Sequence, residues 1–271
     1  MNSLMLKWCV TIVLTIVSFM PAFSQDLLNG SKIWTGFTFT YKVSDKVDVG
    51  YEHVHSIEAR DFDFSFSQGK LFGQYQFNKK FSIGGAYSYM LLPWNGGDNQ
   101  FSYHPNVFGS RTVNNLAING THRFRLGNKF HFKQRIIPQY FFPLVDKFRL
   151  RLNYRMKAYY RADLPLDIVP NVELGVYYYH GGIQVGYQDQ TGGYSYYSPN
   201  GIHRFRMKTA IMLTPMEKWK RLKLIVFYQY QRELNLIGRD INIRNNLGEI
   251  ILPFNNYTAF GVHVLYTLKH Y

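Results

Sequence analysis

The stretch "KFRLRLNYRMKAYYR", Lys147–Arg161, alternates between two kinds of side chain with a period of two. Its even positions run from Phe148 to Tyr160 and are all apolar or aromatic, whereas most of its odd positions carry cations. Because successive side chains of a β-strand point to opposite faces, this pattern predicts a strand with one apolar and one polar face. The fold must therefore offer such strands an apolar medium on one side and a polar medium on the other.

The same alternation recurs along nearly the whole chain after residue 25, and no convincing helical periodicity competes with it. No stretch there has the roughly 18 consecutive apolar residues of a membrane-spanning helix. We therefore predict an all-β fold of about twelve strands, with ten as the second choice. The predicted strands are Lys32–Lys42, Lys46–Ile57, Arg60–Ser67, Lys70–Phe77, Lys80–Leu91, Val113–Leu126, Lys129–Phe141, Lys147–Arg161, Val172–His180, Ile202–Leu213, Leu222–Arg232 and Tyr257–Lys269.

The predicted connections are of two kinds, short turns and three long loops over residues 92–112, 181–201 and 233–256. Outer-membrane barrels have short periplasmic turns and long external loops, whereas long structureless loops are uncommon in compact soluble domains. If both termini are periplasmic, the number of strands must be even. The number depends on Gly69, because a tight turn there gives twelve strands and a bulge gives eleven. The alternation changes phase at Gly69, and this favours the turn.

The first residues predict export. Lys7 precedes an apolar run, Trp8–Met20, and Ala22-Phe23-Ser24 supplies small residues before a cleavage point. These are the marks of a secretory signal peptide, and the run is too short for a membrane helix of about 20 residues. We predict a signal peptide at 1–24 and an outer-membrane β-barrel at 25–271. Cleavage removes the single cysteine, so the mature chain has no disulfide.

The composition restricts the partners. The formal net charge of +14 indicates anionic partners, and export excludes nucleic acid. The 22 Tyr and 22 Phe are typical of strands that cross a membrane interface. Trp34, Trp94 and Trp219 fall at predicted strand ends, where such barrels carry an aromatic girdle. A soluble β-sandwich also alternates, but its strands are usually only about 5–6 residues long. We therefore predict a single up-and-down antiparallel transmembrane β-barrel.

The polar faces of the predicted strands define the lumen. Acids gather on the second and third strands, and bases dominate the sixth, seventh, eighth and tenth, so an acidic wall would face a basic one. This arrangement fits either a pore that selects anionic solutes or a lumen closed by salt bridges. The predicted lumen-facing bases are Arg123, Arg125, Lys133, Arg135, Arg149, Arg151, Arg155, Arg204, Arg206 and Lys208. The predicted lumen-facing acids are Asp48, Glu52, Asp61, Asp63 and Glu173.

Catalytic and metal sites are not predicted. A serine hydrolase needs a base within hydrogen-bond reach of its nucleophile, and "EHVHS" offers His53, His55 and Ser56. Alternation places His55 and Ser56 on opposite faces, which disfavours that pair. The remaining histidines are scattered and lack the spacing of a metal cluster, so we expect no metal and no cofactor.

Several segments resemble the exported β-barrel family known as domain of unknown function 2490. They are "IWTGFTFTYKVSDKVDVGYEH", "GQYQFNKKFSIGGAYSYM", "THRFRLGNKFHFKQR", "FRLRLNYRMK" and the close "HRFRMKTAIML…LKLIVFYQYQ…YTAFGVHVLYTLKHY". Together the segments extend over nearly the whole mature chain. The resemblance implies an outer-membrane barrel and supplies no catalytic residues.

The leading functional expectation is a narrow channel or binding barrel for small anionic solutes, without enzymatic activity. Two alternatives stay open: a lipid-modifying outer-membrane enzyme, and a structural or surface-interaction barrel with a closed lumen. The expected partners are outer-membrane lipid and small anionic solutes, and the expected state is a monomer.

Overall fold

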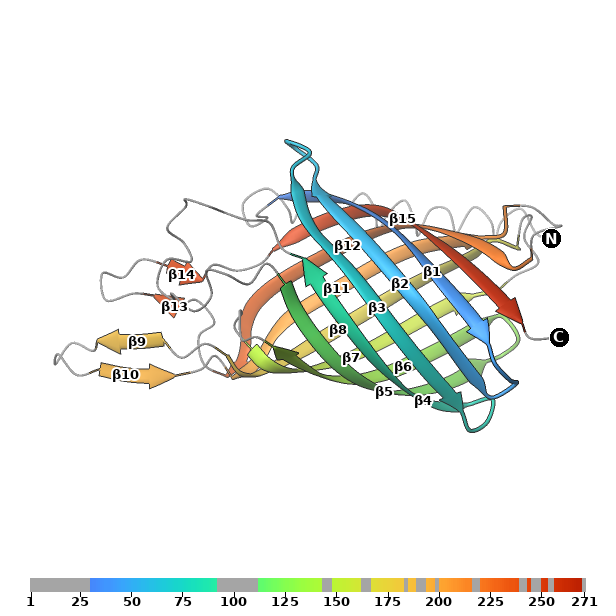
Figure 1. The fold of residues 1–271 in the computed structure, drawn as a ribbon, viewed down its shortest axis with the longest axis horizontal. Coiled ribbons are helices and arrows are strands. Elements are labelled where there is room, and N and C mark those ends of the chain that lie inside the picture. Colours follow the sequence, from blue (N-terminus) through green and yellow to red (C-terminus); the bar gives the residue numbers. More distant parts are fainter. Residues whose placement is uncertain are drawn as a thin grey trace.

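The computed structural model is a closed β-barrel whose strands run obliquely to its long axis (Figure 1). It describes residues 30–91, 112–142, 148–161, 167–182, 185–188, 194–197, 200–215, 220–238, 243–244, 250–252 and 256–269. The predicted signal peptide, Trp94 and Trp219 lie outside these residues. Within the described part of the chain, no helix is long and apolar enough to cross a membrane.

Eleven strands close the barrel, and each pairs with its neighbours in the chain. The predicted alternation therefore identifies almost every strand. The wall strands are β1 (Ser31–Lys42), β2 (Val47–Glu58), β3 (Phe64–Gln76), β4 (Phe81–Leu91), β5 (Thr112–Leu126), β6 (Phe130–Phe142), β7 (Phe148–Tyr160), β8 (Val169–Gly181), β11 (Gly201–Leu213), β12 (Leu222–Gly238) and β15 (Tyr257–Lys269).

The strand number corrects the prediction of twelve, because a single strand, β3, replaces the two predicted at Arg60–Ser67 and Lys70–Phe77. The change of phase comes from a bulge in the β2–β3 pairing, where Ser56 pairs with Phe66 but Ile57 pairs with Phe64. A bulge adds one residue to one strand and so reverses which later positions face inward. Gly69 lies inside the strand, not in a turn.

Closure of the barrel joins β1 to β15 in parallel, whereas the other neighbouring wall strands are antiparallel. Ser31 pairs with Thr258 and Lys42 with Lys269, so the start of β1 and the end of β15 lie at opposite ends of the barrel. The even strand number that was expected from two ends on one side is therefore not found in the described wall. An odd number of strands requires such a parallel pair, because each antiparallel step reverses direction.

The long connections all leave from one end of the barrel, as predicted, because β4, β8 and β12 run in the same direction. We call this the long-connection end and the opposite one the short-turn end. The connection from β8 to β11 contains a two-stranded sheet of β9 (Val185–Gln188) and β10 (Tyr194–Tyr197). The connection from β12 to β15 contains β13 (Ile243–Arg244) and β14 (Ile250–Leu252). Both small sheets stand away from the wall (Figure 1).

The outer surface of the barrel is apolar. On β7, Leu150, Leu152 and Tyr154 are each more than 40% exposed, whereas the intervening Asn153 is fully buried. The same contrast recurs around the wall, and it is the arrangement of a barrel with a lipid-facing exterior and a polar interior. Exposed apolar side chains on the other strands include Phe37, Val49, Leu71, Ile83, Leu116, Ile118, Ile136, Leu174, Ile211 and Phe260.

Exposed tyrosines lie near both ends of the wall. Tyr75 and Tyr266 lie near the short-turn end, and Tyr89, Tyr140 and Tyr178 lie near the long-connection end. Tyrosine belts at two levels are typical of membrane barrels. Of the three tryptophans predicted at this interface, only Trp34 lies among the described residues.

Trp34 does not lie on the outer surface. Its ring packs inside the barrel against Phe66, Phe227 and Tyr257, with ring centroids 5.2, 6.3 and 5.8 Å away. The even positions of β1 face inward, so a residue near the end of a strand is not for that reason at the membrane interface.

Candidate functional site

Most of the predicted lumen cations do lie on the inward face of the wall. They occupy the positions of β5, β6, β7 and β11 that alternate with exposed apolar side chains. Arg149 is the exception, because a register shift between Phe148 and Leu150 leaves it exposed at the end of β7. Arg125 lies on the inward face but at the exposed edge of the short-turn end.

The predicted acids are divided between the lumen and a turn. Asp48 and Glu52 lie on the inward face of β2, and Glu173 lies on that of β8. Asp61 and Asp63 lie in the exposed turn between β2 and β3, outside the lumen. The turn takes them because β3 begins only at Phe64.

The long-connection half of the lumen holds a buried ion pair between Arg204 on β11 and Glu233 on β12. The two side chains are 6% and 1% exposed. The Tyr179 hydroxyl also donates to Glu233 Oε1, over 2.8 Å. One step along the same strands, Arg206 donates to the amide oxygen of Gln231. These arginines are therefore held by partners of the wall itself.

Arg151, also in this half, is held by an amide and by rings. Its Nε donates to Gln139 Oε1 over 2.9 Å. Its guanidinium carbon lies 4.7 Å from the centre of the Phe141 ring, 5.0 Å from Phe148 and 5.5 Å from Tyr177. A guanidinium enclosed by aromatic faces is stabilised by cation–π attraction. Alternation predicts Arg151 as a lumen cation but does not predict this aromatic enclosure.

The acids of β2 bind lysines of neighbouring strands. Glu52 pairs with Lys70 of β3 over 2.6 Å, and Glu58 pairs with Lys32 of β1 over 2.8 Å. The predicted acidic wall is thus largely neutralised within itself. Glu52 still attracts Arg155 across the lumen.

The cations of β5, β6 and β7 face one another near the short-turn end. Arg123 stands directly opposite Lys133, and Lys133 stands directly opposite Lys157. One step along, Arg135 stands directly opposite Arg155. Directly opposed side chains on one face of a sheet have Cβ atoms about 4.5–5.5 Å apart, and like charges in such pairs repel. We call these five residues the basic cluster.

The basic cluster has few anionic partners. Among the described residues its one ion pair joins Arg155 to Glu173 over 3.5 Å, and the other four members form none. Glu173 stands opposite Lys157 and also opposite Lys208 of β11. One carboxylate is therefore shared among several cations.

Three arginines of the cluster carry buried donor atoms without a hydrogen-bond partner among the described residues. They are Nη1 of Arg123, Nε of Arg135 and Nε of Arg155. A buried donor that is left unsatisfied costs about 1–3 kcal/mol, and more when it is charged. The cluster can therefore gain from an added acceptor, above all an anionic one.

Metal-ligating side chains and the lumen histidine His263 could serve other kinds of site. No group of three or more His, Cys, Asp or Glu side chains within the described residues could hold a metal ion. His263 donates to or accepts from Thr38 Oγ1 over 2.8 Å, which fits a structural role. Glu233 was not predicted as a lumen residue, because the predicted eleventh strand ends at Arg232. The alternation could have extended this strand, because Gln229, Gln231 and Glu233 continue one polar face.

Comparison with known proteins gives no family assignment. No protein-family model matches the chain, and no curated protein matches it. The resemblance to domain of unknown function 2490 stays a prediction. Among solved structures, Salmonella typhi OmpF in complex with daunomycin matches with a TM-score of 0.30 and 12% identity over 71% of this chain. The match spans 51% of the OmpF chain, about half its length.

The class of the protein follows from its own geometry. The chain forms a closed β-barrel with an apolar outer surface, exposed tyrosines near both ends and a charged interior.

Proposed function

We propose that the protein is an exported outer-membrane barrel that binds small multivalent anions in the short-turn half of its lumen. The apolar exterior and the tyrosine belts support the membrane location. The basic cluster supports the ligand class. The barrel acts as a monomer in this proposal, because closure leaves no wall strand without a partner on both sides.

The observation that carries the proposal is the direct opposition of Arg123, Lys133 and Lys157. Three like charges in one row repel, so the wall alone is not their best environment. A phosphate-like anion between them removes the repulsion and accepts charge-assisted hydrogen bonds from them. Arginine donors with fixed fork geometry beside lysine point charges suit an anion that has several oxygens.

The two halves of the lumen support a binding barrel more than a continuous pore. In the long-connection half, Tyr177, Tyr179, Gln231 and Glu233 are each almost fully buried. The hydrogen bond from Tyr179 to Glu233 joins β8 to β12 there. A solute that enters from the short-turn end would meet the basic cluster first and this packed half second. A through-channel is the second candidate, supported by the length of the cationic face along β7 and β11.

Isothermal titration tests the proposal, with inorganic pyrophosphate added to the refolded full chain in detergent. The wild type should bind. Lys133→Gln should weaken binding about tenfold or more, because one charge-assisted hydrogen bond is worth about 1.5–3 kcal/mol. Lys32→Gln is the matched control, since it removes the same charge from a lumen lysine that already has Glu58 and Ser65 as partners. Equal weakening by both variants would contradict the assigned site.

Planar-bilayer recording separates the two candidates. A binding barrel should give no steady current, and pyrophosphate should still bind. An anion-selective current that falls in Lys133→Gln but not in Lys32→Gln would favour the channel.

A further inference from the structure

Three polar side chains are linked by hydrogen bonds on the outer face of β2 and β3. The Ser67 hydroxyl lies 3.2 Å from Nε2 of His53, and the Tyr51 hydroxyl lies 3.2 Å from Nδ1 of the same ring. With its proton on Nδ1, His53 donates to the Tyr51 oxygen and accepts from Ser67 at Nε2. A hydroxyl held against an imidazole whose other nitrogen is fixed by a third group is the arrangement that activates a serine nucleophile.

The neighbouring residues do not form this arrangement. His55 stands directly opposite Ser67 in the strand pairing, but its ring packs against Phe64 with the centroids 5.6 Å apart. Ser56 is fully buried on the lumen side. The serine therefore comes from the adjacent strand and not from the "EHVHS" segment itself.

The array lies at the rim of the wall. Ser67 pairs with Leu91, the last residue of β4, and the β2–β3 hairpin continues beyond this level (Figure 1). Tyr89, one of the exposed belt tyrosines, lies beside it, since its ring approaches the backbone at Gly69. Tyrosine belts mark the membrane–water interface, which is also where lipid headgroups join their acyl chains. Ser67 and His53 are half-buried, so both can be reached from outside.

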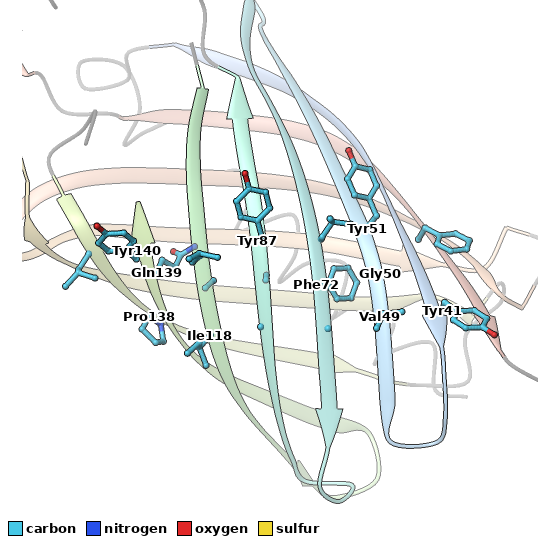
Figure 2. A pocket seen from close by; sticks show the side chains of 18 residues that line it. Tyr41, Val49, Gly50, Tyr51, Phe72, Tyr87, Ile118, Pro138, Gln139 and Tyr140 are labelled. Carbon is cyan, nitrogen blue, oxygen red and sulfur yellow. The ribbon is translucent and has the colours of Figure 1, made fainter. Parts of the chain in front are cut away.

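An apolar hollow on the outer wall includes Tyr51 in its lining. Tyr51 lines a hollow of about 920 Å³ on the outer wall, which extends past Tyr87 to Tyr140 (Figure 2). Its floor contains Gly73 and Gly85, which pair directly across β3 and β4 and have no side chains to fill it. The volume lies within the range of about 300–1,000 Å³ that is usual for small-molecule sites. On a lipid-facing wall, the occupant that fits a long apolar hollow is an acyl chain.

We propose that Ser67 is the nucleophile of an acyl-ester hydrolysis on membrane lipid, with His53 as its base and the hollow as the acyl-chain site. Tyr51 is a positioning residue, because it fixes the tautomer and orientation of His53. This activity uses the outer face of the wall. It is independent of anion binding in the lumen.

The steps balance without a metal or a redox partner. Ser67 Oγ bonds to the ester carbonyl carbon while its proton passes to Nε2 of His53. The ester C–O bond breaks, and the leaving alcohol oxygen takes that proton. Water then attacks the acyl-serine and gives a proton to His53, the bond to Ser67 breaks, and Ser67 recovers the proton as the fatty acid leaves.

The test uses the full chain refolded in detergent, with phosphatidylethanolamine in mixed micelles and an alkyl fluorophosphonate as the covalent probe. Wild type should release fatty acid, and mass spectrometry should find the probe on Ser67. Ser67→Ala should abolish both signals. Release by Ser67→Ala at the wild-type rate, no release by the folded wild type, or a probe on another serine would overturn the proposal.

The histidines provide a matched pair of variants. His53→Gln should slow release by about 10²-fold or more, the usual contribution of a general base. His55→Gln should leave the rate unchanged, because His55 shares the face but contacts Phe64. Heat-modified migration on a gel shows that each variant is folded. Equal losses in the two variants would contradict the assignment of the base.

Separate kinetic measurements test the roles of Tyr51 and of the hollow. Tyr51→Phe should lower kcat and leave KM unchanged, as expected for a residue that acts through His53. Gly73→Leu should raise KM for an ester with a long acyl chain and not for a butyryl ester, since a side chain at Gly73 meets open space in the hollow. An equal effect of Gly73→Leu on both esters would contradict the acyl-chain site.

Discussion

Glu233 of β12 accepts hydrogen bonds from the Arg204 guanidinium of β11 and the Tyr179 hydroxyl of β8, so one buried carboxylate links three strands. We expect Glu233→Ala to lower the free energy of unfolding by about 3–5 kcal/mol, because it leaves the buried Arg204 charge without its carboxylate. Urea unfolding of the refolded barrel, followed by tryptophan fluorescence, measures this.

The double variant Arg204→Met/Glu233→Leu is the control for that pair. Replacing both ions with apolar side chains of similar volume is often neutral or stabilising. It should therefore recover most of the stability. A Glu233→Ala variant that loses less than about 1 kcal/mol would place the pair among solvent-screened surface bridges.

Depth in the membrane should decide the cost of an outward-facing charge. Leu152→Arg places a cation on the outer face in the middle of β7 and should cost about 2–4 kcal/mol in a lipid bilayer. Leu126→Arg makes the same kind of change at the last residue of β5, where the cost should fall to about 0–1 kcal/mol. Refolding into liposomes across a urea series compares the two variants. Equal costs would mean that the outer face of β7 does not meet hydrocarbon.

Two glycines on opposite faces of the wall should respond differently to alanine. A Cβ at Gly36 would lie 2.6 Å from the His53 carbonyl oxygen and 2.7 Å from Nδ1 of His263. Gly36→Ala should therefore destabilise the barrel by about 1–3 kcal/mol through overpacking. A Cβ at Gly120 would meet nothing within 4 Å. Gly120→Ala should leave the midpoint of thermal unfolding unchanged or raise it, and a larger loss there than at Gly36 would contradict the inward packing of β1.

Removing one member of the basic cluster should stabilise the barrel without ligand. Lys133→Gln relieves the repulsion from Arg123 and Lys157, which should raise the free energy of unfolding by about 0.2–1 kcal/mol at low salt. At about 1 M salt the Debye length is about 3 Å, so the gain should shrink. Unfolding at two ionic strengths measures both effects. A Lys133→Gln barrel that is less stable than wild type at low salt would mean that the cations do not repel.

Much of the wall could be predicted from alternation alone, because a two-sided environment imposes a period of two on every strand. The strand edges of Tyr257–Lys269 coincide with the structure, and the faces of β7 are as predicted from Leu150 onward. Before the register shift the prediction is wrong, because Phe148 is buried and Arg149 is exposed. The number of strands could not be predicted in this way. A bulge opposite Ser56 and a turn at Gly69 both shift the phase by one residue, and only the pairing distinguishes them.

The sites depend on contacts that the sequence does not encode locally. Ser67 reaches His53 because the register of β2 against β3 brings them together, although "EHVHS" contains a nearer serine. Lys133 is recognisable as a lumen cation from alternation, but its opposition to Arg123 and Lys157 depends on the register of two hairpins. Trp34 turns inward because its position on β1 is even, whatever its nearness to the strand end.

The most direct measurement of the central claim is anomalous diffraction from crystals of the wild-type barrel grown with selenate, beside crystals of Lys133→Gln. We expect a selenium peak bounded by Arg123, Lys133, Arg135 and Lys157 in the wild type, and a loss of that peak in the variant. No peak at the basic cluster, or a peak of equal height in both crystals, would contradict it.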